Sequence, residues 1–278
     1  MLMAVIQSAG LTDVGRKRKG NEDRFSINDK LGLYIVADGM GGHAAGEVAS
    51  KIVVDTINEY MDRFKQDEKA EELEDLDQTL SKDANRLLSS IHLANKSVYQ
   101  LSEKNPKLHG MGSTVSAVLF AENTSIIANV GDSPVYLIRN GEIDLLSVLH
   151  TVQAEHMALH PDNRKIGENF NHVLTRGMGI GETVKPDLSE LQIYKDDILI
   201  ICSDGLSDKV KPSEIRDVAL TCPPRKTCDN LIQMANDRGG EDNITLIVIK
   251  IKNTRSIIFQ LKKMIDRFIK IRKNIMNG

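Results

Sequence analysis

The chain has 278 residues, of which 41% are hydrophobic, enough for a well-buried core in one domain of generous size with an appendage. Its net charge of -3 gives no overall basic field, so a nucleic-acid partner is not expected. Three cysteines lack zinc-like or redox spacing, no signal segment is evident, and no apolar run approaches the roughly 18 residues of a membrane span. We therefore expect a reduced, cytoplasmic chain.

The N-terminal part of the sequence predicts short strands followed by two long helices. Short apolar runs predict strands over 5–9, 24–27 and 33–37. Apolar residues at helical spacing then predict one helix from about 46 to 64 and a second helix across 87–101 that ends before Pro106. The acidic stretch 65–83 between them is expected to be an exposed connection.

The rest of the chain predicts an antiparallel sheet and further helices. Apolar runs predict strands over 110–120, 124–130, 135–139, 142–147, 188–194, 198–202 and 244–251. Asn140-Gly141 is a strong two-residue hairpin signal, so at least one pair is antiparallel. The polar stretch 148–173 is expected to be a surface flap, in which His156 and His160 lack a third metal ligand. Helices are predicted over 212–220 and 225–237, which together favours an α/β sandwich with helices outside.

Acidic residues stand at the ends of predicted strands, and Asp38 is the clearest case. It is the first polar residue after the apolar run 33–37, and Gly39, Gly41 and Gly42 follow it closely. These glycines allow a backbone carbonyl or N–H to turn toward a ligand, and the helix that follows adds the positive end of its dipole. A tight strand-to-helix turn without chemistry would explain this segment alone equally well.

The same context recurs at Glu22-Asp23, Asp132, Asp204 and Asp242. Carboxylates that converge in space repel one another unless cations neutralise them, and all-oxygen sites suit magnesium or manganese rather than zinc. The residues themselves therefore favour a two-metal hydrolytic centre. The basic loop 15–20 adjoins the first of these carboxylates, and an arginine there would suit a phosphate group through its planar fork of donors.

These motifs resemble those of the metal-dependent serine/threonine protein phosphatases, the PPM or type 2C family, in their bacterial form, over roughly residues 9–250. They occur in the family's order: Arg18-x-x-Asn21-Glu22-Asp23, Asp38-Gly-Met-Gly-Gly-His43, Gly112-Ser-Thr114, Asn129-Val-Gly-Asp132-Ser133, Leu174-Thr-Arg-Gly-Met-Gly179, Cys202-Ser-Asp204-Gly-Leu-Ser-Asp208 and Gly240-Glu-Asp242-Asn243-Ile244-Thr245. The resemblance implies a central antiparallel β-sandwich flanked by α-helices on both faces, a four-layer αββα fold, in agreement with the elements above.

The resemblance also implies two manganese or magnesium ions. Asp38 would bridge them, and the carbonyl of Gly39, together with Asp204 and Asp242, would complete their shells directly or through water. Asp132 would join Asp204 in binding a third, weaker ion. A water between two such ions loses a proton near neutral pH and attacks phosphorus in line, so no covalent phosphoenzyme is needed.

The remaining roles implied by the resemblance lie around these ions. Glu22 and Asp23 would act on the metals through bound water, and Arg18 would hold the substrate phosphate. His43 is a weaker candidate for giving a proton to the leaving oxygen, because a glycine turn can also hold a histidine for packing. The expected substrates are phosphorylated proteins, products of a serine/threonine kinase, and the enzyme is expected to be a monomer.

Three departures from the family's pattern lie toward the flap: Pro134, Leu149 and Gly177-Met178. They favour a narrow or unusual target more than a change in metal binding.

Two other functions stay open at this point. One is a catalytically silent scaffold of the same fold, and the other is a metal-dependent hydrolase of small phosphoesters.

The C-terminal segment 253–278 lies beyond the resemblance. It carries seven basic residues and one acidic residue on a chain of net charge -3. Its apolar residues recur at helical spacing, which predicts a basic amphipathic helix. Such a helix can dock on the acidic body, pair with a partner or lie on an anionic membrane surface, and our hypothesis is peripheral membrane or partner binding. We thus expect a phosphatase domain over 1–252 and a separate helix over 253–278.

Overall fold

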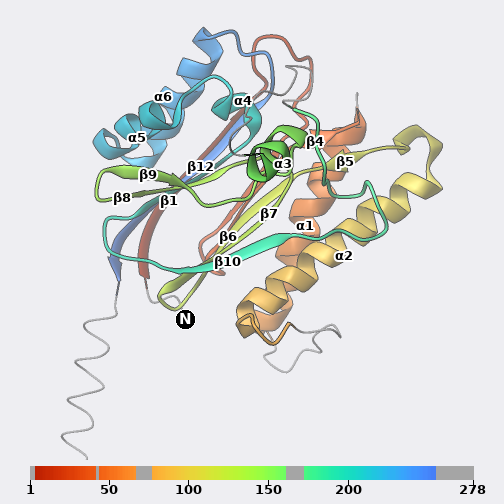
Figure 1. Cartoon of the computed structure of the whole chain (residues 1–278), viewed down its shortest axis with the longest axis horizontal. Coiled ribbons are helices and arrows are strands. Elements are labelled where there is room, and N and C mark those ends of the chain that lie inside the picture. Colours follow the sequence, from red (N-terminus) through yellow and green to blue (C-terminus); the bar gives the residue numbers. More distant parts are fainter. Residues whose placement is uncertain (1–3, 42–43, 67–76, 161–171, 255–278) are drawn as a thin grey trace, which may run out of the picture.

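The protein is a sandwich of two five-stranded antiparallel sheets in a computed structural model that describes residues 4–41, 44–66, 77–160 and 172–254 (Figure 1). The first sheet has the order β1 (Ala4–Asp13), β12 (Ile244–Thr254), β11 (Ile198–Cys202), β8 (Val135–Arg139) and β9 (Glu142–Leu145). The second has the order β10 (Asp187–Gln192), β7 (Thr124–Val130), β6 (Val115–Ala121), β3 (Leu33–Ala37) and β2 (Arg24–Asn28).

Helices cover both outer faces of the sandwich. The long helices α1 (Ala44–Gln66) and α2 (Lys82–Lys104) pack on the second sheet, and α4 (Asp204–Ser207), α5 (Pro212–Thr221) and α6 (Pro224–Asp237) pack on the first, as Figure 1 shows. Three short elements complete the described part: η1 (Pro106–Leu108), α3 (Val152–Leu159), and a small sheet of β4 (Gly39–Met40) with β5 (Gly112–Ser113). The predicted four-layer αββα fold is confirmed.

The central strands are apolar throughout because both of their faces are buried. In β3, Leu33 and Ile35 face the helices, while Tyr34 and Val36 enter the core between the sheets. Side chains alternate in the same way along β11, as the two-residue period of a strand requires. The ends of β3 and β11 are therefore fixed by apolar packing on two sides, and a carboxylate follows each end.

Most of the predicted elements are present with small shifts at their ends. The Asn140-Gly141 hairpin is confirmed, and both residues have the positive φ angles, 54° and 81°, that favour a tight two-residue turn. The last strand continues to Thr254, two residues beyond the end of the domain expected at 252.

No helix in the described part of the chain is long and apolar enough to cross a membrane. The predicted C-terminal helix, from residue 255 onward, lies outside the described residues.

The expected flap at 148–173 differs from its prediction in two ways. It contains the helix α3, which is capped by the Thr151 side chain accepting a hydrogen bond from the N–H of Ala154. Its first part is not at the surface, because His150 and Thr151 are buried. The tertiary partners of His150, described below, explain why a polar and aperiodic sequence gave no sign of this burial.

Candidate metal centre

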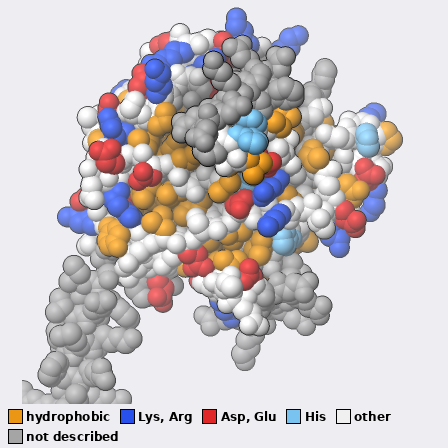
Figure 2. All heavy atoms as spheres, in the orientation of Figure 1, with side chains coloured by type: hydrophobic (Ala, Val, Ile, Leu, Met, Phe, Trp, Pro, Cys, Tyr) orange, Lys and Arg blue, Asp and Glu red, His pale blue; other side chains and the backbone are white. Residues whose placement is uncertain are grey.

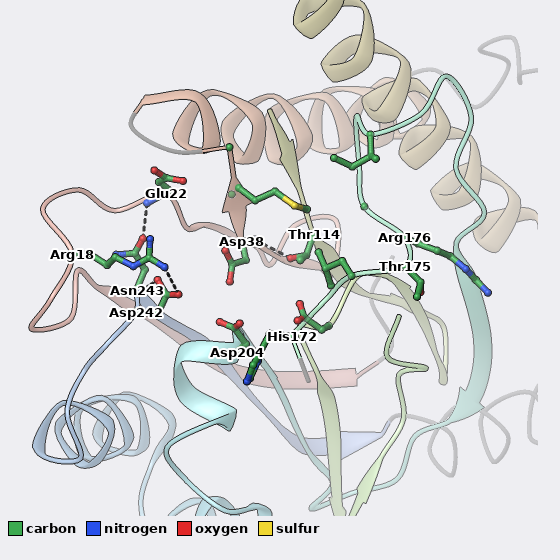
Figure 3. Close-up of a pocket in the computed structure, with 17 residues that line it drawn as sticks. Arg18, Glu22, Asp38, Thr114, His172, Thr175, Arg176, Asp204, Asp242 and Asn243 are labelled. Carbon is green, nitrogen blue, oxygen red and sulfur yellow. Dashed lines mark hydrogen bonds and ion pairs between the residues drawn. The ribbon is translucent and has the colours of Figure 1, made fainter. Parts of the chain in front are cut away.

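The predicted acidic residues meet in one open pocket at the end of the sandwich where β3 and β11 stop. Its volume is about 510 Å³. The predicted site residues in its lining are Arg18, Glu22, Asp38, Gly39, Asp132, Asp204 and Asp242. Figure 3 shows the carboxylates of Asp38, Asp204 and Asp242 pointing into the same space from three separate segments. The convergence predicted from the sequence is therefore present in the structure.

Asp38 lies at the centre, and its backbone is held on both sides. Its N–H donates to the hydroxyl of Thr114 (3.0 Å), and its carbonyl accepts from the N–H of Thr114 (2.8 Å) and from the hydroxyl of Ser113 (3.0 Å). Burial raises the pKa of Asp38 well above its ordinary value, and the negative charges of the neighbouring carboxylates, Asp23 first, raise it further. A cation bound here would offset both effects, because its charge stabilises the ionised carboxylates.

Two glycines let the segments of the site approach one another. A Cβ on Gly39 would lie 2.2 Å from the carbonyl oxygen of Gly46 in α1. A Cβ on Gly205 would lie 2.0 Å from the carbonyl oxygen of Asn243. Any side chain at either position would push these backbones apart, and with them Asp38 from α1 and Asp204 from the Asp242 loop.

Two buried carboxylate oxygens have no hydrogen-bond partner in the described part of the chain: Oδ1 of Asp23 and Oδ1 of Asp204. Asp23 is almost fully buried and accepts a hydrogen bond from the Ser203 hydroxyl (2.8 Å) through its other oxygen. Burial is the main cause that raises the pKa of Asp23 to about 6 and that of Asp204 to about 8. Since buried polar atoms are normally satisfied, these oxygens fit the ligands of divalent ions.

Arg18 lies at the mouth of the pocket, where the sequence predicted a phosphate-binding arginine. Its Nη2 is 2.7 Å from Oδ2 of Asp242, and about half of its side chain is exposed. Asn243 organises this side of the pocket: its amide donates to the carbonyls of Val14 and Gly20, and its Oδ1 accepts from the N–H of Glu22. One side chain thus holds both ends of the basic loop beside the carboxylates.

Asp132 also lines the pocket, and His150 supports its loop. Burial raises the pKa of Asp132 to about 6. The N–H of Gly131 donates to Nδ1 of His150 (3.1 Å), whose Nε2 lies 2.6 Å from Asp187. Arg176 joins the same Asp187 oxygen at 2.7 Å. The sequence analysis missed this network, which connects the Asp132 loop to Arg176 in the lining of the pocket.

Four further histidines, at 43, 156, 160 and 172, differ in their relation to the site. His43 lies outside the described residues. His156 and His160 stack at a ring distance of 4.8 Å, and no described acidic or cysteine side chain joins them in a possible metal cluster. His172 lines the main pocket, although the sequence analysis assigned it no role.

Comparisons of the sequence with known proteins find a phosphatase family and similar serine/threonine phosphatases. The sequence profile of the family described as "Protein phosphatase 2C" matches residues 16–245. The chain is 33% identical over 245 residues to "Serine/threonine phosphatase stp" of Listeria innocua, covering 86% of this chain and 93% of that protein.

Solved structures of serine/threonine phosphatases are also similar to this chain. The Mycobacterium tuberculosis serine/threonine phosphatase PstP/Ppp is similar with a TM-score of 0.76 and 29% identity, covering 89% of this chain and 99% of that one. A structure of the PstP catalytic domain in complex with two manganese ions is similar with a TM-score of 0.75 and 31% identity, with the same coverage.

The crowded carboxylates predict how the metal-free protein responds to pH. An acid whose pKa is raised by folding binds more protons in the folded chain, so its contribution to stability is present at low pH and is lost as pH rises through the folded pKa. With chelator present, the free energy of unfolding in urea should therefore fall between about pH 4 and pH 8, by an amount on the order of a few kcal/mol.

Asp204→Asn should flatten this decrease and be more stable than the wild type at pH 8, because it removes a buried charge. The exposed Asp217→Asn variant is the control and should follow the wild type. An Asp204→Asn variant with the wild-type pH dependence would contradict the explanation by charge crowding.

Proposed function

The chain belongs to the protein phosphatase 2C family and is a metal-dependent serine/threonine protein phosphatase, and we propose that the carboxylates around Asp38 hold its metal ions. The observation that carries this proposal is the pair of buried, unpartnered oxygens on Asp23 and Asp204 beside Asp38. Asp38 would bridge two manganese or magnesium ions, and Asp204 and Asp242 would complete their shells with the carbonyl of Gly39.

When bound, two divalent ions supply the activated water that attacks phosphorus and the positive charge that stabilises the phosphoryl group. The protein residues position these partners. Glu22 and Asp23 hold water beside the centre, and Arg18 holds the substrate phosphate with its planar donors. Asp132 and Asp204 hold a third, weaker ion. His43 is the proposed donor of a proton to the leaving serine or threonine oxygen.

The proposed reaction needs no covalent phosphoenzyme. The residues that line the pocket include no cysteine, and Cys202 and Cys228 are buried in the apolar layer beneath α4 and α6. In this proposal, hydrolysis is a single in-line displacement at the open pocket, where the phosphorylated side chain of a protein is bound.

We propose that the substrates are proteins phosphorylated by a serine/threonine kinase, and that the enzyme acts as a cytoplasmic signalling monomer. Acidic and basic side chains are interspersed around an apolar centre on the face shown in Figure 2, so this face offers no single-sign field for nucleic acid. The open pocket, with Arg18 exposed at its mouth, suits a phosphorylated segment of a protein chain.

The first test of this function is metal-dependent release of phosphate from a phosphothreonine peptide. Activity should require added manganese or magnesium and be abolished by chelator, because carboxylate and water shells bind these ions reversibly. Asp38→Asn and Asp242→Asn should each lose most of the turnover while staying folded, and Asp217→Asn should not. Near wild-type turnover of either variant at saturating metal would disprove the assignment, and faster hydrolysis of a nucleotide would identify a different substrate class.

A second prediction concerns Arg18. Loss of the guanidinium group should weaken substrate binding by about 1.5 kcal/mol. This value is at the low end for a hydrogen bond to a charged group, because the side chain is half exposed. Arg18→Ala should thus raise the Michaelis constant roughly tenfold, with a smaller effect on metal binding. An unchanged Michaelis constant together with lost metal affinity would assign the phosphate to Arg16 or to a lysine of the loop.

We also propose that the predicted C-terminal unit, expected at 253–278, acts apart from the phosphatase domain and starts after β12, at residue 255. Its excess of lysine and arginine beside a stripe of apolar residues supports peripheral membrane or partner binding. The full chain should sediment with anionic vesicles at low salt more than a chain ending at Thr254, and high salt should weaken the effect. Equal partitioning of the two chains would exclude membrane binding.

A further inference from the structure

We propose that His172 supplies a nitrogen ligand to the third divalent ion, at a site that it shares with Asp204 and Asp208. The inference rests on the proposed function, in which ions bind at Asp204. It goes beyond that function because the residues implied for the third ion, Asp132 and Asp204, provide only oxygen. His172 and Asp208 were given no metal role by the sequence analysis.

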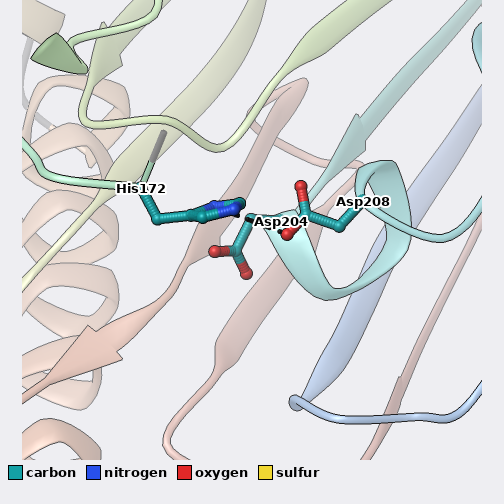
Figure 4. Close-up of side chains that lie close together, drawn as sticks. All are labelled: His172, Asp204 and Asp208. Carbon is teal, nitrogen blue, oxygen red and sulfur yellow. Dashed lines mark ion pairs between the residues drawn. The ribbon is translucent and has the colours of Figure 1, made fainter. Parts of the chain in front are cut away.

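The geometry of the three side chains fits one ion. Each offers one ligand atom, and these atoms all lie within 4.8 Å of one another. Nδ1 of His172 is 3.5 Å from Oδ2 of Asp208, as the dashed line in Figure 4 shows. Ligand atoms at roughly 2.0–2.2 Å from one ion lie at most about 4.4 Å apart. A closure of a few tenths of an ångström would therefore complete the site.

The two carboxylates are held on one side of α4. Asp204 and Asp208 are four residues apart, the spacing that places side chains on the same face of a helical turn. The N–H of Asp208 donates to the carbonyl of Asp204 (2.8 Å) and closes this turn. The pair is therefore positioned by the backbone before any ion arrives.

A second observation points to a ligand at this position. Oδ1 of Asp204 is buried and has no hydrogen-bond partner in the described part of the chain. The other two side chains are accessible: that of His172 is 62% exposed and that of Asp208 is 42% exposed. The arrangement combines an unsatisfied buried oxygen with two ligands through which an ion can enter from solvent. Asp132 lines the same pocket, near enough for the charges of Asp208 and His172 to influence its pKa.

A nitrogen ligand changes which ion the site prefers. Imidazole favours first-row transition ions, whereas carboxylates and water suit magnesium. The third site should therefore bind manganese in preference to magnesium, while the oxygen-only centre at Asp38 accepts both ions. If His172 acted only by its contact with Asp208, its removal would change manganese and magnesium binding equally.

The experiment measures bound manganese in the full-length protein from the electron paramagnetic resonance signal of free Mn²⁺, with and without competing Mg²⁺. The variants are His172→Ala, Asp208→Asn and the control His109→Ala. His109 is a matched control because it is exposed, its Nδ1 lies 3.8 Å from Glu103, and it is not among the residues that line the pocket. Circular dichroism confirms that each variant is folded.

His172→Ala should weaken the weakest class of manganese sites about tenfold and change magnesium binding less than twofold, with the tighter sites and the control unchanged. Asp208→Asn should weaken the same class. Pulsed electron paramagnetic resonance should show coupling to a ¹⁴N nucleus when all sites are loaded with manganese, and this coupling should disappear in His172→Ala.

Two results would overturn the inference: wild-type protein with three bound Mn²⁺ ions and no nitrogen coupling, or equal losses of manganese and magnesium affinity in His172→Ala. A different result would contradict the proposed function itself. If Asp38→Asn and Asp242→Asn bind the two tighter ions as the wild type does, the metal assignment itself is wrong, and the inference falls with it.

Discussion

Electrostatic repulsion among buried carboxylates is the constraint on which the rest of this structure depends. Asp23, Asp38 and Asp204 come from separate parts of the chain, and neighbouring carboxylates raise the pKa of each one, beyond the larger effect of burial: Asp23 and Asp204 act on Asp38, and Asp242 acts on all three. The apolar packing of the sandwich must hold these groups together against that repulsion when no cation is bound. The metal-free fold is therefore less stable at this end of the sheets, and the proposed divalent cations would offset the repulsion.

The sandwich can hold this arrangement because its central strands are buried on both faces. β3 and β11 are anchored by helices on one side and by the opposite sheet on the other, so the residues that follow them have little freedom to separate. Glycine at 39 and 205 then allows backbone contacts that a Cβ would prevent. Rigid strand ends and close backbone contacts together fix the carboxylates at the end of the sandwich.

The sequence predicted those structural features that depend on a few neighbouring residues. Continuous apolar runs ending in a carboxylate identified β3, β11 and the positions of Asp38 and Asp204, because burial on both faces leaves a clear pattern in a few residues. The network of His150 could not be predicted, since its partners lie 19 and 37 residues away in the sequence and no local pattern connects them. The eight-residue helix α3 has too weak an apolar pattern to be recognised. His172 and Asp208 meet only through tertiary structure.

The ion pair between Arg18 and Asp242 has a consequence for the order of events. The same carboxylate is a proposed metal ligand, and the same guanidinium is the proposed phosphate holder, so in the metal-free protein each occupies the other. In the proposed roles, a cation that binds Asp242 releases the Nη2 donor of Arg18 for a phosphate oxygen, so metal binding favours substrate binding. The same competition means that the metal-free protein offers an incoming phosphate fewer free donors than the loaded protein does.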